Sequence, residues 1–186
     1  MEIVLIVGRD GAGKSTLVRG LCGVRDGRNI HPHSTNVVVL KHSDGFEHRT
    51  FLTVSSINEA DENDRYEFEK DKEYENGRTV APWHLRDVLD KYSQKNSETA
   101  CSKAILCINT NVATQGWTLN DYAAVINDPT FSHTITHTVR LAVGNPPTIN
   151  PAATFQNVPD KWFYRGNPAT PRNQVAADVR NHIGLI

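Results

Sequence analysis

A glycine-rich loop near the start of the chain constrains the fold more than any other feature of this sequence. Residues 3–7 (IVLIV) form a continuous apolar run, which is typical of a strand buried inside a parallel sheet. Residues 8–15 (GRDGAGKS) follow, and residues 14–22 then show helical spacing of apolar side chains. This order of strand, turn and helix places backbone N–H groups around a concavity at a helix N-terminus, where an anion is stabilised.

Residues 8–15 fit the P-loop (Walker A) pattern G-x-x-x-x-G-K-[ST] at every fixed position. The pattern predicts that Lys14 reaches the β- and γ-phosphates of a nucleotide and that the Ser15 hydroxyl binds Mg²⁺. A chance glycine-rich turn is the alternative, and the strand and helix on either side argue against it. The residues expected to hold phosphate are Asp10, Gly11, Ala12, Gly13, Lys14 and Ser15.

The remaining elements predict an α/β fold. Strands are predicted at 37–40, 104–108, 138–143 and 162–164, and the hairpin turn at 43–45 makes 48–54 the antiparallel partner of 37–40. Helical spacing predicts helices over 83–94, 119–126 and 170–183. Because strands and helices alternate, we expect one domain over residues 1–186. Its three-layer fold would be of the P-loop NTPase type, with a mainly parallel sheet and one antiparallel hairpin.

Charge and cysteine content narrow the class of protein. Lys and Arg total 20 against 21 Asp and Glu, a net charge of -1, which argues against a dedicated nucleic-acid binder. No apolar run reaches about 18 residues, so no membrane span is expected. Glu at position 2 and the absence of a C-terminal CaaX cysteine predict no direct membrane anchor. Three cysteines without a CxxC pair favour a reducing, cytoplasmic location.

Two further segments have open interpretations. Residues 59–75 carry nine acids and three bases, and they lie within a charged insertion at about 56–82. This segment is either a solvated surface element or a surface that binds a protein partner. His133 and His137 have the i,i+4 spacing of metal ligands, but their β-branched neighbours favour a strand or a loop, which argues against a metal site there.

Beyond the P-loop, the chain resembles the Ras-like small GTPases. Residues 8–17 (GRDGAGKSTL) are similar to the ADP-ribosylation-factor branch, residues 104–111 (AILCINTN) resemble the fourth strand of the family, and residues 141–145 (LAVGN) resemble the strand before its guanine-reading motif. The resemblance implies a fold of small-GTPase type that binds GTP or GDP with Mg²⁺, with ATP left open. It also implies a second Mg²⁺ ligand at Thr35, an α-phosphate contact at Thr16, and a nucleotide base bordered by Asn145 and Ala169.

The departures from that family pattern are equally informative. Where the family has DxxG the chain reads Ser55-Ser56-Ile57-Asn58, and Glu59 or Asp61 is left as a substitute for the metal contact. Where it has NKxD the chain reads Asn145-Pro146-Pro147-Thr148, and of SAK only Ala169 remains. Losing the acid that pairs with guanine removes the contact that normally rejects the wrong base.

These losses predict an atypical GTPase or pseudo-GTPase with slow or absent hydrolysis and no identified catalytic residue. It would act as a switch or as an interaction module, contacting a protein partner through its switch regions and residues 59–75. A P-loop kinase acting on a small molecule is one alternative. A scaffold with an empty nucleotide site is another.

Overall fold

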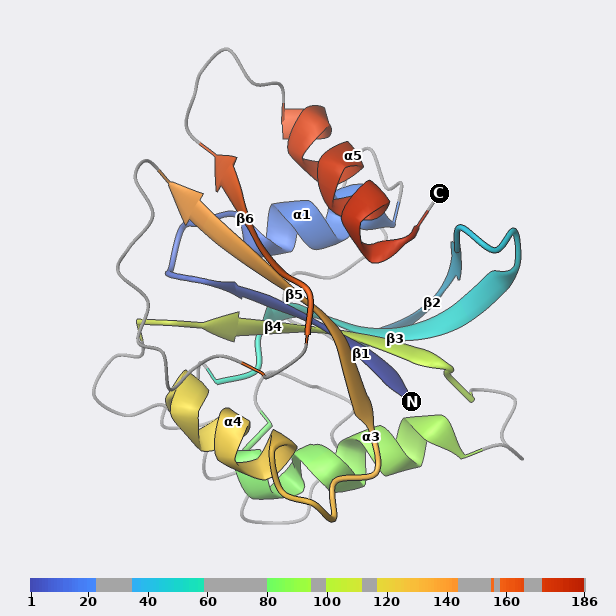
Figure 1. Ribbon diagram of the computed structural model, residues 1–186, viewed down its shortest axis with the longest axis vertical. Coiled ribbons are helices and arrows are strands. Elements are labelled where there is room, and N and C mark those ends of the chain that lie inside the picture. Colours follow the sequence, from blue (N-terminus) through green and yellow to red (C-terminus); the bar gives the residue numbers. More distant parts are fainter. Residues whose placement is uncertain are drawn as a thin grey trace.

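The computed structural model describes residues 1–22, 35–58, 80–94, 100–111, 117–143, 155, 158–165 and 172–185. Within these residues six strands form one sheet, in the order β2-β3-β4-β1-β5-β6 (Figure 1). The strands are β1 (Glu2–Gly8), β2 (Thr35–Lys41), β3 (Glu47–Ser56), β4 (Lys103–Asn109), β5 (Thr134–Val143) and β6 (Asp160–Arg165).

The sheet is mostly parallel. β1 is parallel to both of its neighbours, β4 and β5. The pairs β3–β4 and β5–β6 are also parallel. The antiparallel pair is β2 with β3. Gly45 adopts a φ of 82° in the turn that joins them, as a tight hairpin requires. The predicted α/β fold with one antiparallel hairpin is therefore confirmed.

Helices cover both faces of the sheet, as Figure 1 shows. On one face lie α1 (Lys14–Leu21) and α5 (Arg172–Ile183), which we call the α1/α5 layer. On the other face lie α3 (Leu85–Ser93), entered through the short 3-10 turn η2 (Pro82–His84), and α4 (Leu119–Ile126); this is the α3/α4 layer. None of the described helices has the length and apolar character needed to cross a membrane.

β1 contributes to both cores because its side chains alternate between two apolar faces. Ile3, Leu5 and Val7 pack in the core under the α3/α4 layer. Val4 and Ile6 pack in the core under the α1/α5 layer. A strand with both faces buried must be apolar throughout, which explains the continuous run of residues 3–7.

β5 begins four residues earlier than the sequence pattern predicts, because Thr134, Ile135 and Thr136 continue the strand. The register against β1 shifts by one residue there: Ile3 pairs with Ile135, and Val4 pairs with His137. Thr136 is the extra residue of this β-bulge, and its hydroxyl donates to the Ile3 carbonyl at 3.1 Å.

The bulge separates the two histidines that have metal-ligand spacing in the sequence. His133 lies 3.0 Å from Asp90 of α3, between Nε2 and Oδ1. The His137 ring meets the His182 ring of α5 edge-on, with 5.2 Å between centroids. The two side chains therefore contact helices on opposite faces of the sheet, and they form no joint metal site.

Candidate phosphate-binding site

The loop between β1 and α1 has the backbone shape that its glycines predict. Gly11 has a φ of 70° and Gly13 a φ of 95°, both in the left-handed region that favours glycine. Gly13 is also the N-cap of α1, and no side chain accepts a hydrogen bond there. The first N–H groups of α1 consequently face the loop without a capping side chain, as an anion site requires.

Gly8 lets the loop leave the sheet in close contact with β5. A Cβ atom at this position would lie 3.0 Å from the Leu141 carbonyl oxygen and 3.1 Å from the Ala12 Cβ. Ala12 is itself buried, and its N–H donates to the Arg9 carbonyl at 3.2 Å. The first glycine of the motif is thus needed for packing, whereas Gly11 and Gly13 are needed for their dihedral angles.

Lys14 is buried, with 7% of its surface exposed, although it carries a charge. Its Nζ donates to the Gly8 carbonyl at 2.9 Å and to the Arg9 carbonyl at 3.0 Å. Burying a lysine is costly unless its ammonium is hydrogen-bonded, and the loop carbonyls meet that need. The chain therefore buries a basic side chain against the carbonyls of its own glycine-rich loop.

Ser15 reaches from α1 to the end of β3. Its hydroxyl donates to the Val54 carbonyl at 2.9 Å. A hydroxyl that binds a metal ion must direct its proton elsewhere, and Val54 accepts that proton here. The Ser15 oxygen lone pairs remain available, so the residue fits the Mg²⁺ role predicted for it.

Asp10 and Thr16 are exposed at the rim of the loop. The Asp10 carboxylate accepts a hydrogen bond from the Gly11 N–H at 2.7 Å. That N–H is one of the groups expected to hold phosphate, so an arriving anion has to displace a carboxylate of the loop itself.

The segment after β3, where the family pattern has DxxG, is used for structure. Asn58 is fully buried, and its side-chain amide donates to the carbonyl of Asn109 at 2.8 Å and to that of Trp117 at 2.9 Å. Its Oδ1 accepts the Asn109 N–H at 2.8 Å. Asn58 therefore fastens β3 to β4 and to the start of α4. Glu59 and Asp61, the suggested substitutes, lie outside the described residues.

β4 lies between β3 and β1, so the residues after β4 flank the loop directly, which sequence reasoning missed. The Thr110 N–H donates to the Gly8 carbonyl at 3.2 Å. The Asn109 side chain accepts the Asn111 N–H at 3.0 Å. Three polar residues directly after a buried strand were the available signal, since such residues lie at the carboxyl edge of a parallel sheet.

A small cavity of about 160 Å³ adjoins the loop at Gly8 and Arg9, and Thr110, Arg140 and Trp162 also line it. Arg140 is buried, and its Nε donates to both carboxylate oxygens of Asp160, at 2.8 and 2.7 Å. Because Asp160 neutralises this guanidinium, Lys14 is the cation best placed for phosphate.

The residues predicted from the family resemblance are placed only in part. Thr35 is the first residue of β2 and pairs with Thr53 of β3. Ser15 contacts Val54 in β3, so Thr35 lies on the strand next to that contact. The structure does not describe its side chain. Asn145 and Ala169, the predicted base contacts, and residues 59–75, the predicted partner surface, lie outside the described residues.

Comparison with protein-family models, with curated proteins and with solved structures finds no match to this chain. The geometry of the described residues therefore has to carry the functional assignment.

Proposed function

We propose that the loop of residues 8–15 binds the phosphate groups of a nucleoside di- or triphosphate together with Mg²⁺. The observation that carries this proposal is the buried Lys14 ammonium at the N-terminus of α1, 2.9 Å from the Gly8 carbonyl. A cation, two left-handed glycines and an uncapped helix N-terminus together form an anion site.

Each residue of the loop has a role in this proposal. Lys14 turns from the loop carbonyls to the β- and γ-phosphates, and the N–H groups of residues 10–15 surround them. Ser15 contributes one Mg²⁺ ligand while Val54 accepts its proton. The bound ion would neutralise phosphate charge and orient the nucleotide. By resemblance, Thr16 contacts the α-phosphate, Thr35 contributes the second Mg²⁺ ligand, and Asn145 and Ala169 border the base.

Slow or absent hydrolysis forms part of the proposal. Hydrolysis needs a group that orients or deprotonates a water molecule beside the γ-phosphate. In the described end of β3 the side chains are Ser55, Ser56 and Asn58, none of which is a carboxylate, and Asn58 is fully engaged with β4 and α4. A switch or interaction module of the small-GTPase kind fits these losses, and that finer assignment rests on the sequence motifs.

The experiment begins with the purified chain. Any nucleotide released on denaturation is identified, and the stripped protein is titrated with GTP and ATP in Mg²⁺. Lys14→Ala should weaken binding at least about 10- to 100-fold, since a hydrogen bond to a charged group contributes about 1.5–3 kcal/mol. Lys91→Ala, an exposed lysine on α3, is the matched control and should bind like the unaltered chain.

The outcomes separate the candidate functions. Preference for GTP supports the small-GTPase-like switch. Equal or preferred ATP binding, with turnover that requires a small-molecule acceptor, supports the kinase alternative. No binding of either nucleotide, or unchanged binding by Lys14→Ala, overturns the proposal.

A further inference from the structure

A second group of ligand atoms lies at the hairpin turn between β2 and β3, far along the chain from the P-loop. His42 follows β2, Asp44 is in the turn, and His48 is in β3. One nitrogen or oxygen atom from each lies within 4.8 Å of the others. We infer that these three side chains bind a divalent transition-metal ion of the zinc class, independently of the P-loop.

The distances suit such an ion. His48 Nε2 lies 2.9 Å from Asp44 Oδ2, and His42 Nδ1 lies 3.6 Å from the same oxygen. In a tetrahedral zinc site with bonds of about 2.0–2.2 Å, ligand atoms lie about 3.3–3.6 Å apart. Two imidazoles and one carboxylate form a donor set that zinc accepts, with a fourth position left for water or another ligand.

His42 supplies the observation that separates a metal site from an ordinary surface ion pair. Its Nδ1 is buried, and within the described residues it has no hydrogen-bond partner. Leaving such an atom unpaired is costly, and an ion held with Asp44 and His48 would satisfy it. An Asp44–His48 ion pair without a metal leaves the His42 nitrogen 3.6 Å from Asp44 Oδ2, which is too far for a hydrogen bond.

The other two ligands are oriented by contacts of the kind found around metal sites. Asp44 Oδ1 accepts the Phe46 N–H at 2.9 Å, which directs Oδ2 toward the histidines. His48 Nδ1 lies 3.3 Å from the Ser102 hydroxyl, while its Nε2 faces Asp44. A metal-binding histidine usually has its second ring nitrogen fixed in this way.

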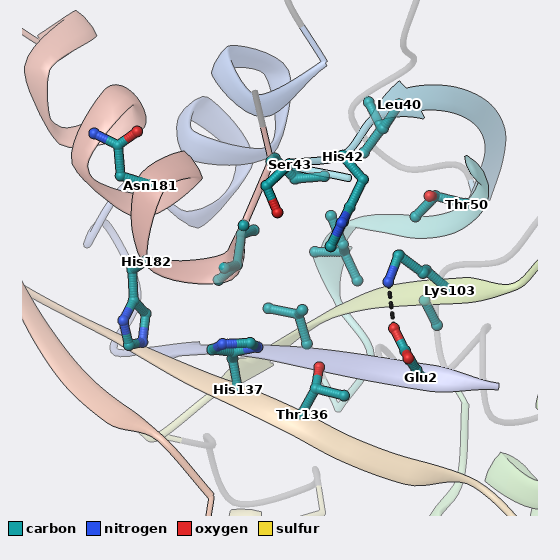
Figure 2. A pocket seen from close by; sticks show the side chains of 16 residues that line it. Glu2, Leu40, His42, Ser43, Thr50, Lys103, Thr136, His137, Asn181 and His182 are labelled. Carbon is teal, nitrogen blue, oxygen red and sulfur yellow. Dashed lines mark hydrogen bonds and ion pairs between the residues drawn. The ribbon is translucent and has the colours of Figure 1, made fainter. Parts of the chain in front are cut away.

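The surroundings keep the site accessible and its charge balanced. His42 also lines a cavity of about 400 Å³ at the amino end of the parallel strands, opposite His137 and His182 (Figure 2). Across this cavity Lys103 donates to the Glu2 carboxylate, so the nearby ammonium is neutralised.

The test uses the full chain without a histidine tag, freed of metal with a chelator and titrated with zinc chloride by calorimetry. The unaltered chain should bind zinc, and His42→Gln and His48→Gln should each weaken it at least about 10-fold. His84→Gln is the matched control: its Nδ1 lies 3.6 Å from Asp87, the same separation as His42 from Asp44, but among the described residues no third ligand completes a group there. That variant should bind zinc normally.

The sequence also has two histidines outside the described residues, His31 and His33. Three results would overturn the inference: no zinc binding, unchanged binding by both His42→Gln and His48→Gln, or binding lost only when His31 and His33 are replaced. Because a variant can fail to fold, histidine ring NMR of the unaltered chain provides a second measurement. Zinc should shift the His42 and His48 signals and leave His84 unmoved. Lys14→Ala should not change zinc affinity, so failure of the P-loop proposal and failure of this one are distinguishable.

Discussion

The two ends of the sheet carry binding groups of opposite character. At the carboxyl end of β1, the loop of residues 8–15 offers backbone N–H groups and the Lys14 ammonium. At the amino end of β3, the turn offers the lone pairs of His42, Asp44 and His48. Figure 1 shows the β1–α1 loop and the β2–β3 hairpin on opposite sides of the molecule. An anion is therefore expected at one end and a cation at the other, and we predict that removing one leaves binding of the other unchanged.

We expect the largest loss of stability when Asn58 is replaced. This substitution tests whether Asn58 holds the strands together at the carboxyl end of the sheet. Asn58→Ala removes the three hydrogen bonds that Asn58 makes with the N–H and C=O of Asn109 and with the C=O of Trp117. A buried hydrogen bond contributes about 1 kcal/mol, so we expect a loss of about 3 kcal/mol in the free energy of unfolding, measured with urea. Asn120→Ala, exposed on α4, should change it little. Equal stability of the two variants would contradict the role of Asn58 in fastening β3 to β4.

A pair of glycine substitutions compares the two turns directly. Gly8→Val places side-chain atoms against the Leu141 carbonyl, and overpacking of this kind costs about 1–3 kcal/mol. It should also abolish nucleotide binding. The Cβ added by Gly45→Ala contacts no other atom. The left-handed φ of 82° alone destabilises this variant, by about 1–2 kcal/mol. Nucleotide affinity should survive in Gly45→Ala, and its loss there would mean that the two ends are coupled.

Acid should weaken the fold through its buried and half-buried histidines. Burial is the main cause that lowers the pKa of four of them below the ordinary 6.5, namely His42, His133, His137 and His182. The unfolded chain then binds protons that the folded chain does not. Stability is therefore complete above about pH 6.5 and decreases as the pH falls from 6.5 toward the folded-state values.

Urea unfolding of metal-free protein at pH 7.5 and 5.5 measures this decrease. Replacing His137 and His182 together with Gln should make the decrease smaller, because two of the four groups no longer titrate. A free energy of unfolding that is equal at the two pH values would contradict the assignment of these histidines as neutral in the folded state.

The smallest predicted effect concerns Asp10. Asp10→Ala removes the carboxylate that accepts the Gly11 N–H and that repels an arriving phosphate. We expect nucleotide affinity to rise about 2- to 5-fold, because the repulsion between one exposed carboxylate and a phosphate is weak in water. Asp44→Asn serves as the cross-check, since it should weaken zinc and leave the nucleotide unaffected. Weaker nucleotide binding by Asp10→Ala would show that this carboxylate helps to hold the complex.

The loop could be predicted from sequence because its determinants are adjacent in the chain. The dihedral angles of Gly11 and Gly13 and the position of Lys14 at the start of α1 follow from residue types at fixed spacing. The strands and helices were predictable for the same reason, apart from ends such as Thr134, where β-branched residues extended β5.

The remaining features depend on contacts between distant parts of the chain. No local pattern states that β4 enters the sheet between β3 and β1, and therefore none predicts that Asn58 contacts Asn109 across 51 positions. His48 likewise meets Ser102 only because β3 pairs with β4. The polar residues at 109–111 indicate the carboxyl edge of the sheet, but nothing in the sequence indicates which distant residues they contact.

The β-bulge at Thr136 reverses which face of the sheet the odd-numbered residues of β5 point to. Before it, Ile135 packs toward the α3/α4 layer; after it, Val139 and Leu141 pack toward the α1/α5 layer, although all of these positions are odd-numbered. Deleting Thr136 would restore strict alternation and turn one half of the strand over, exposing apolar side chains and burying polar ones. The length of this strand, counted in residues, is therefore as much a part of the fold as the identity of any side chain in it.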